Sequence, residues 1–208
     1  MITEIRSIFN VNSKRQKSLW KETLRKTIHI MGLLIPVFYW YLPEYWIVLL
    51  LSVALLVAIV VEILRFRNQI FRNLFNHYLG FLLRPKEQRS ITGATYWIVG
   101  ALITILLYPK AIAIFAISML SVSDALAAWV GKGIGRTPIR SNKTLEGSLA
   151  FFLSAFLIAV PVLHWSTATA LLGALAGTVL EWGILPLNDN LTVPIGSGLF
   201  VVLLKAIL

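Results

Sequence analysis

Long apolar runs recur along the whole chain and constrain its fold more than any other feature. A membrane-crossing helix needs roughly 20 mainly apolar residues, and in lipid only helices and closed barrels satisfy every backbone polar group. The 208 residues are 58% hydrophobic and only 13% charged, against about 25% charged in soluble domains. The runs predict about seven membrane-spanning helices, at residues 28–42, 46–64, 92–108, 111–131, 147–163, 168–185 and 193–208.

The segments between these runs leave no room for a separate soluble domain. We therefore expect one all-α, polytopic membrane bundle that comprises residues 1–208, with a basic interfacial segment at 1–24 and polar connections at 65–91 and 132–146. In the first connection, the helical spacing of Ile70, Leu74 and their neighbours predicts an amphipathic helix on the membrane surface.

Basic residues are distributed unequally between the two sides of this bundle. Of the 19 Lys and Arg residues, 17 fall in segments 1–27, 65–91 and 132–146, which seven spans place on one side. The positive-inside rule puts that side, and the N-terminus, in the cytoplasm of a cell-membrane protein.

The formal net charge of +10 would indicate nucleic acid in a soluble protein. Here the basic residues flank apolar runs, so anionic lipid headgroups and nucleotide phosphates are the expected partners, and nucleic acid is not. Cysteine is absent, which excludes a disulfide, a thiolate nucleophile and a Cys-ligated zinc site. The oligomeric state stays open.

Asp124 is the most informative acidic residue. It lies inside the predicted fourth span, about 10 Å from the cytoplasmic end, where an unpaired acid costs at least about 2–3 kcal/mol. Two interpretations follow: a structural ion pair with a neighbouring Lys or Arg, or a functional carboxylate. Ordinary anchoring at the membrane boundary is the interpretation for four other charged residues: Arg65, Arg67, Arg72 and Lys205.

Small residues follow Asp124 along one helical face, including Gly131 and Gly135. Such a stripe lets neighbouring helices approach closely. Past Gly131, free backbone N–H groups together with Lys132 and Arg136 are suited to cradling phosphate. The chain contains neither GxxxxGK[ST] nor GxGxxG, so neither a P-loop nor a Rossmann site is supported.

Further charged residues fall at the same predicted boundary. Lys143 and Glu146 are neighbours if helical, Glu181 lies near the cytoplasmic end of the sixth span, and Asp189 follows in the next loop. Acids able to hold Mg²⁺ beside basic side chains are typical of phosphoryl transfer, which mostly requires positioning and charge neutralisation.

Four short motifs occur in order: Arg25-Lys26-x-x-His29, Asp124-x-x-Ala127-x-x-x-Gly131-x-x-x-Gly135-Arg136, Lys143-Thr144-x-Glu146-Gly147-Ser148, and Glu181…Asp189-Asn190-x-x-x-Pro194. Together they resemble the polyprenol kinase family, which includes dolichol kinase, phytol kinase and CTP-dependent diacylglycerol kinase and is also described as phosphatidate cytidylyltransferase-like. That pattern usually has Gly where this chain has Ser123, and Lys-Ser where it has Lys143-Thr144. Thr92 opens a further segment similar to members of the group.

The resemblance implies a membrane kinase that transfers the γ-phosphate of CTP to a lipid alcohol, either a polyprenol, phytol or diacylglycerol. With the charge pattern, it predicts Asp124, Lys143 and Glu146 as catalytic residues and Asp124, Glu181 and Asp189 as Mg²⁺ ligands. The predicted substrate-binding residues are Arg25, Lys26, His29, Thr92, Gly131, Lys132, Gly135, Arg136 and Asn190. The residues themselves do not distinguish CTP from ATP, name the lipid, or decide which carboxylate is the base.

Two other functions fit parts of the pattern. A phosphatidate cytidylyltransferase would use similar residues to make a CDP-lipid and release pyrophosphate. A small proton- or cation-coupled transporter would use its acids as ion sites, but these acids gather at one boundary rather than at the midplane.

Overall fold

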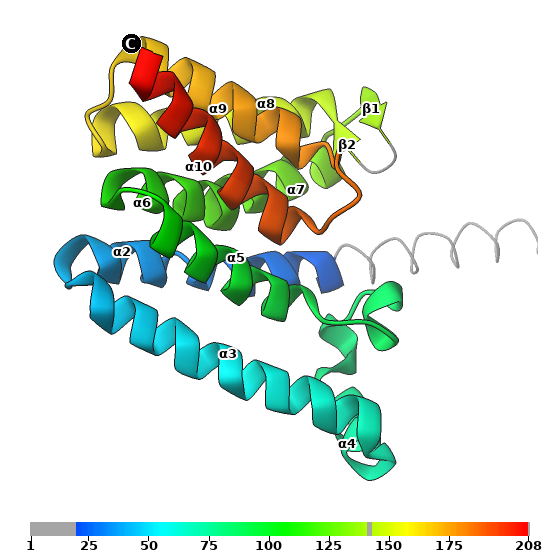
Figure 1. Ribbon diagram of the computed structural model, residues 1–208. Coiled ribbons are helices and arrows are strands. Elements are labelled where there is room, and N and C mark those ends of the chain that lie inside the picture. The colour runs from blue at the N-terminus through cyan, green and yellow to red at the C-terminus, as the bar shows by residue number, and fades with distance from the viewer. Residues whose placement is uncertain (1–19, 141–142, 208) are drawn as a thin grey trace, which may run out of the picture.

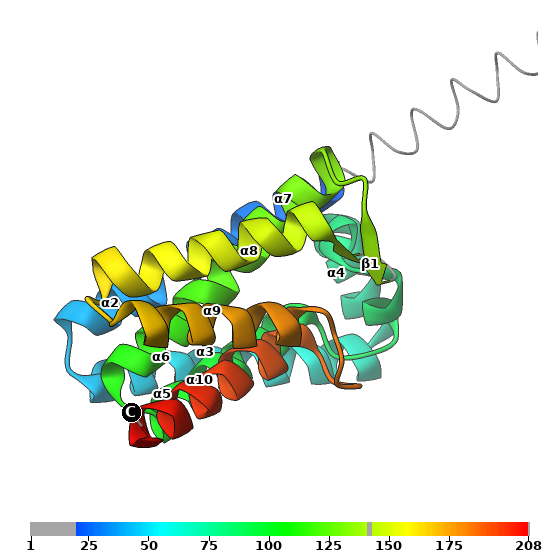
Figure 2. The same cartoon turned by 90° about the horizontal axis from the view of Figure 1, so that it is seen from above.

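Helices form nearly all of the computed structural model, which describes residues 20–140 and 143–207 (Figure 1). The long helices lie roughly side by side in both views (Figures 1 and 2). In chain order the elements are a helix over residues 20–31, α2 (Leu34–Tyr41), α3 (Glu44–Arg67), α4 (Gln69–Leu79), η1 (Gly80–Leu82), η2 (Pro85–Gln88), α5 (Gly93–Leu107), α6 (Lys110–Ser118), η3 (Met119–Ser123), α7 (Asp124–Gly133), β1 (Pro138–Arg140), β2 (Lys143–Thr144), α8 (Leu145–Leu157), η4 (Ile158–Val162), α9 (Thr167–Glu181) and α10 (Asp189–Ile207).

Within the described residues, four helical segments are long and apolar enough to cross a membrane: α3, the continuous α6–η3–α7, α8 with η4, and α10. Helices α5 and α9 are apolar but have 15 residues each. The predicted first span coincides with helix 20–31 and α2, which Gly32 and Leu33 separate. The expected helical membrane bundle is confirmed in this coarse form, and the number of seven crossings stays a prediction.

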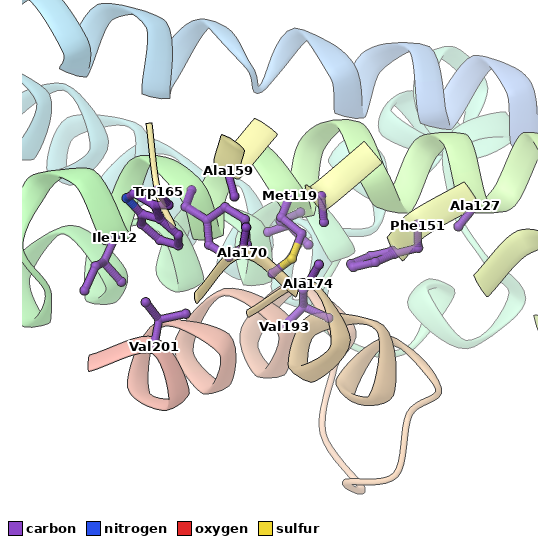
Figure 3. Close-up of a cluster of buried hydrophobic side chains, with 13 residues drawn as sticks. Ile112, Met119, Ala127, Phe151, Ala159, Trp165, Ala170, Ala174, Val193 and Val201 are labelled. Atoms are coloured by element: carbon purple, nitrogen blue, oxygen red, sulfur yellow. The ribbon is translucent and has the colours of Figure 1, made fainter. Parts of the chain in front are cut away.

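The segment α6–η3–α7 runs through the middle of the bundle (Figure 1), and every α6 residue from Ile112 to Ser118 is buried. Its central part, η3, is π-helical, a rare geometry that occurs often at functional sites. It ends immediately before Asp124. Met119 of this segment packs with apolar side chains from other parts of the bundle, among them Phe151, Trp165 and Val193 (Figure 3).

The glycine stripe lets α7 and α8 approach closely. A Cβ added at Gly147 would lie 2.8 Å from the carbonyl oxygen of Ala127, and one at Gly131 would lie 3.0 Å from Oγ1 of Thr144. A larger side chain would therefore push the two helices apart. Close helix packing, one of the two roles expected for this stripe, is present.

The predicted amphipathic helix in the first polar connection is α4. Asn68 caps it by accepting a hydrogen bond from the backbone N–H of Phe71 at 3.0 Å. None of its residues is buried; Ile70 is 81% exposed, whereas Phe71 and Phe75 are half-buried against the bundle.

The second polar connection contains more regular structure than a loop. After α7 ends at Gly133, β1 and β2 pair as antiparallel strands, with Pro138 opposite Thr144 and Arg140 opposite Lys143. Because α8 begins directly after β2, the hairpin holds Lys143 beside the end of the bundle.

Candidate functional site

A buried ion pair joins Lys26 of helix 20–31 to Asp124, the first residue of α7. The two residues are only 6% and 5% exposed. His29 lies one helical turn after Lys26, and its Nε2 is 3.5 Å from Oδ2 of Asp124 and 2.9 Å from the carbonyl oxygen of Leu120. A carbonyl only accepts hydrogen bonds, so Nε2 of His29 carries the proton in this contact.

Lys143 forms a second ion pair, with Glu181 at the end of α9, and its Nζ lies 3.7 Å from Oδ2 of Asp189 at the start of α10. Burial alone would lower the pKa of Lys143. The carboxylates of Glu181 and Asp124 outweigh that effect and raise the pKa above its usual value. Lys143 is therefore a permanent positive charge between these acids at physiological pH.

Glu22 connects a third set of charges. Its carboxylate pairs with Arg25 on the same helix and lies 3.0 Å from Nζ of Lys132 on α7. Burial alone would raise the pKa of Glu22, but Lys132 and Arg25 outweigh it, with Lys26 adding to their effect, and the pKa is lowered. Sequence reasoning missed Glu22, although its spacing of three and four residues from Arg25 and Lys26 would have placed it on their helical face.

Together these contacts bring most of the predicted charged residues into one polar layer between helix 20–31, α7, the hairpin and the α9–α10 connection. The residues involved are Arg25, Lys26, His29, Asp124, Lys132, Lys143, Glu181 and Asp189. The convergence therefore exists in three dimensions. The individual catalytic and binding roles stay predictions.

Other predicted site residues make hydrogen bonds that connect parts of the fold. Glu146 accepts hydrogen bonds from the backbone N–H of Thr137 at 3.2 and 3.3 Å, which closes the base of the hairpin. The backbone N–H of Thr92 donates to Glu62 at 2.7 Å, and the amide of Asn190 donates to the carbonyl of Gly93, also at 2.7 Å. The remaining three, Gly131, Gly135 and Arg136, lie at the end of α7 and in the connection that follows it.

Arg65 is not the membrane-boundary anchor that the sequence suggested. It is 2% exposed, lies 2.7 Å from Oε2 of Glu62, and donates to the carbonyls of Glu87 and Ser90 at 3.0 and 2.5 Å. Sequence reasoning assigned it to the boundary because it ends an apolar run, and no local pattern reveals that a loop 25 residues later folds back over it.

A cavity of about 530 Å³ opens beside the polar layer. Charged side chains such as Arg25 and Lys26 line it together with Ala58, Val61 and other apolar side chains of α3, α4 and α5. A cavity with both charged and apolar lining suits an amphipathic ligand.

Within the described residues, no group of three or more His, Asp or Glu side chains is placed to hold a metal ion by itself. Phosphoryl-transfer enzymes, however, bind Mg²⁺ through one or two carboxylates plus substrate phosphates and water. The Oε2 atom of Glu181 is buried and lacks a hydrogen-bond partner, so it has a free acceptor position. Glu181 therefore offers the kind of oxygen ligand that Mg²⁺ prefers, and Asp124 and Asp189 are carboxylates of the same chemical type.

Known proteins match most of the chain. CTP-dependent diacylglycerol kinase 1 of Schizosaccharomyces pombe is 26% identical over 179 residues, which cover 76% of this chain and 81% of the relative. The Saccharomyces cerevisiae kinase of the same name is 29% identical over 71% of this chain and 60% of its own length. A probable chloroplastic phytol kinase of Oryza sativa is 31% identical over 57% of this chain and 44% of its own length.

Over most of its length, this chain is similar to these kinases, which supports the polyprenol kinase family. No protein-family model and no solved structure matches it. Within this family of lipid kinases, the named relatives are CTP-dependent diacylglycerol kinases and phytol kinases, so the family expected from the four motifs is confirmed.

Proposed function

We propose that this polyprenol kinase family member transfers the γ-phosphate of CTP to the hydroxyl of a lipid alcohol. One observation carries the proposal: in the buried pair of Lys26 and Asp124, Asp124 is close enough to the cationic Lys143 to affect its pKa, and Lys26 lines the partly apolar cavity. Phosphate and lipid can therefore meet at one carboxylate. CTP as donor is supported by two relatives that are named CTP-dependent diacylglycerol kinases.

In the proposed reaction the lipid hydroxyl oxygen forms a bond to the γ-phosphorus, and the bond from that phosphorus to the β,γ-bridging oxygen breaks. CDP leaves with the electron pair, and the hydroxyl proton passes to a base. Lys143, Arg25, Lys26 and Arg136 neutralise phosphate oxygens, which is the main requirement of this chemistry. Asp124 either accepts the proton or helps to hold the metal.

Mg²⁺ would supply neutralisation of the triphosphate charge, held by Asp124, Glu181 and Asp189 together with phosphate oxygens. Asp124 and Glu181 are both paired with lysines. To hold the metal, each must either separate from its lysine or bind the metal through its other carboxylate oxygen. The lysines would then be free to contact phosphate.

We also propose that this site faces the cytoplasm of a cell membrane. The basic residues gather at the ends of helices that carry the site, as the positive-inside rule requires. Cytoplasmic CTP would then reach the hairpin side directly.

The deciding experiment uses purified protein with CTP labelled on the γ-phosphate or on the base, and a panel of diacylglycerol, phytol and polyprenol. We expect labelled lipid phosphate and CDP in equal amounts, dependent on Mg²⁺. With phosphatidate as acceptor, pyrophosphate and a CDP-lipid would identify a cytidylyltransferase instead. If the protein catalyses neither reaction but carries protons or cations across the membrane of vesicles, it is a transporter.

A further inference from the structure

Residues of helix 20–31, α3, α4, η1 and the start of α5 line the cavity beside the polar layer. Figure 1 shows α4 and the β1–β2 hairpin at the same end of the bundle, on either side of helix 20–31. The hairpin carries Lys143, so the cavity and the proposed phosphate side reach the Lys26–Asp124 pair from different directions.

The lining combines polar and apolar side chains. Lys26 and His29, which both contact Asp124, are among the polar ones. The apolar lining residues include Ile28, Val61, Phe75, Leu79, Leu82 and Ile98. Such a surface would accept a hydrocarbon chain while its polar end lies beside Asp124.

Helix α3 separates this cavity from the surface that a bilayer would cover. Ala58 and Val61 line the cavity, whereas Val57 and Val60, each one residue earlier, are 57% and 46% exposed on the apolar outer face. On the opposite wall Ile28 is 47% exposed as well as lining the cavity. An apolar route from the bilayer into the cavity therefore passes between helix 20–31 and α3.

The charges of the lining are balanced, which bears on the ligand's headgroup. Three basic side chains (Arg25, Lys26 and Arg84) and three acidic ones (Glu22, Glu62 and Glu87) line the cavity. The acids are held by neighbours on the protein, such as Arg65 on Glu62 and the backbone N–H of Gly93 on Glu87. Without an excess of positive charge, the cavity favours an uncharged headgroup over an anionic lipid.

We infer that this cavity is the acceptor site: an uncharged lipid alcohol enters from the bilayer between helix 20–31 and α3 and presents its hydroxyl to the Lys26–Asp124 pair. The inference rests on the proposed kinase function and adds the location of the lipid, its route and its charge class. The phosphorylated product carries new negative charge that the balanced lining does not compensate, so it leaves toward the membrane.

The test fills the cavity from α3. Ala58→Phe places a ring among the apolar lining residues, and Ala58→Leu is a milder variant in case the larger one folds poorly. Displacing the equivalent of two methylene groups of lipid should raise the KM for the lipid alcohol about tenfold, with the KM for CTP unchanged. Val57→Phe is the matched control, because it adds the same ring on the outer face of the same helix and should alter neither constant.

A second measurement needs no turnover. A photoreactive diacylglycerol, added without nucleotide, should label peptides that contain residues 58–61 and 92–98, and Ala58→Phe should abolish that labelling while Val57→Phe preserves it. If a folded, active Ala58→Phe or Ala58→Leu protein keeps the lipid KM and the labelling, the cavity is not the acceptor site although the kinase function stands. If no alcohol is phosphorylated but the labelling pattern holds, the kinase function fails and the lipid site stands.

Discussion

Asp124 illustrates how one residue can satisfy two interpretations at once. The ion pair with Lys26 offsets the cost of burying a carboxylate, which is what a structural role requires. The same carboxylate adjoins His29, the π-helical η3 and a cavity lined by Lys26. Ser121 and Ser123 in η3 also have buried hydroxyl oxygens without hydrogen-bond partners, so polar groups remain available around it.

Single and double variants separate these roles. Asp124→Asn leaves the Lys26 ammonium buried without its counter-charge, and we expect a loss of about 3–5 kcal/mol of stability together with the loss of activity. Adding Lys26→Met removes the stranded charge and should restore most of the thermal stability. Turnover in the double variant should stay about 10²–10³-fold or more below the parent protein. Recovery of both stability and turnover would show that the pair is structural alone.

At the scale of elements, contacts near the C-terminal end of α3 position the segment before α5. Glu62 accepts from the backbone N–H of Thr92 at 2.7 Å and from the hydroxyl of Thr95 at 3.2 Å, while Arg65 donates to two carbonyls of the same segment. Asn190 ties the start of α5 to α10 through its bond to Gly93. The part of the cavity lining that these residues form is thereby fixed relative to α10.

Arg65→Met tests this link between α3 and α5. It leaves Glu62 buried without its paired charge and two carbonyls without their donor, so we expect a loss of about 3–5 kcal/mol of stability. Arg67→Met is the matched control, because Arg67 is exposed two residues later on the same helix, and surface changes usually stay within about 0.5 kcal/mol. Thermal melts in detergent measure both, and equal melting temperatures for the two variants would contradict a stabilising network.

At the scale of the whole molecule, orientation in the membrane decides whether the polar layer can meet cytoplasmic nucleotide. Lys143 in the hairpin and Asp189 at the start of α10 lie at the same end of the bundle as the other charges of the layer. The connection between α8 and α9, just before Thr167, belongs to the opposite end. The two ends should therefore face different compartments.

Site-directed labelling tests that orientation, and the absence of native cysteine leaves no background. A cysteine at Asn188 should react with a membrane-impermeant thiol reagent only after the cytoplasmic side is opened. A cysteine at Thr167 should react from outside intact cells. The reverse pattern would place the site away from cytoplasmic nucleotide and overturn the proposed orientation.

Much of the site was predictable because its residues come in short, helically spaced motifs. Lys26 and His29 share a face one turn apart, and Asp124 stands out because a buried acid is costly. Their partners were less predictable. Glu22 lies outside every motif considered, and the contacts of Arg65 depend on residues 22 and 25 positions away.

By itself the sequence determined the membrane class, the helical content and the family, because apolar run length and motif order are local properties of the chain. Only the tertiary structure decided which distant charges pair: Lys26 with Asp124, Lys143 with Glu181, and Lys132 with Glu22. It also decided that a cavity opens between helix 20–31 and α3. Pairing and cavities depend on how helices far apart in the chain pack together, and hydrophobic periodicity specifies which face of a helix is buried but not its neighbour.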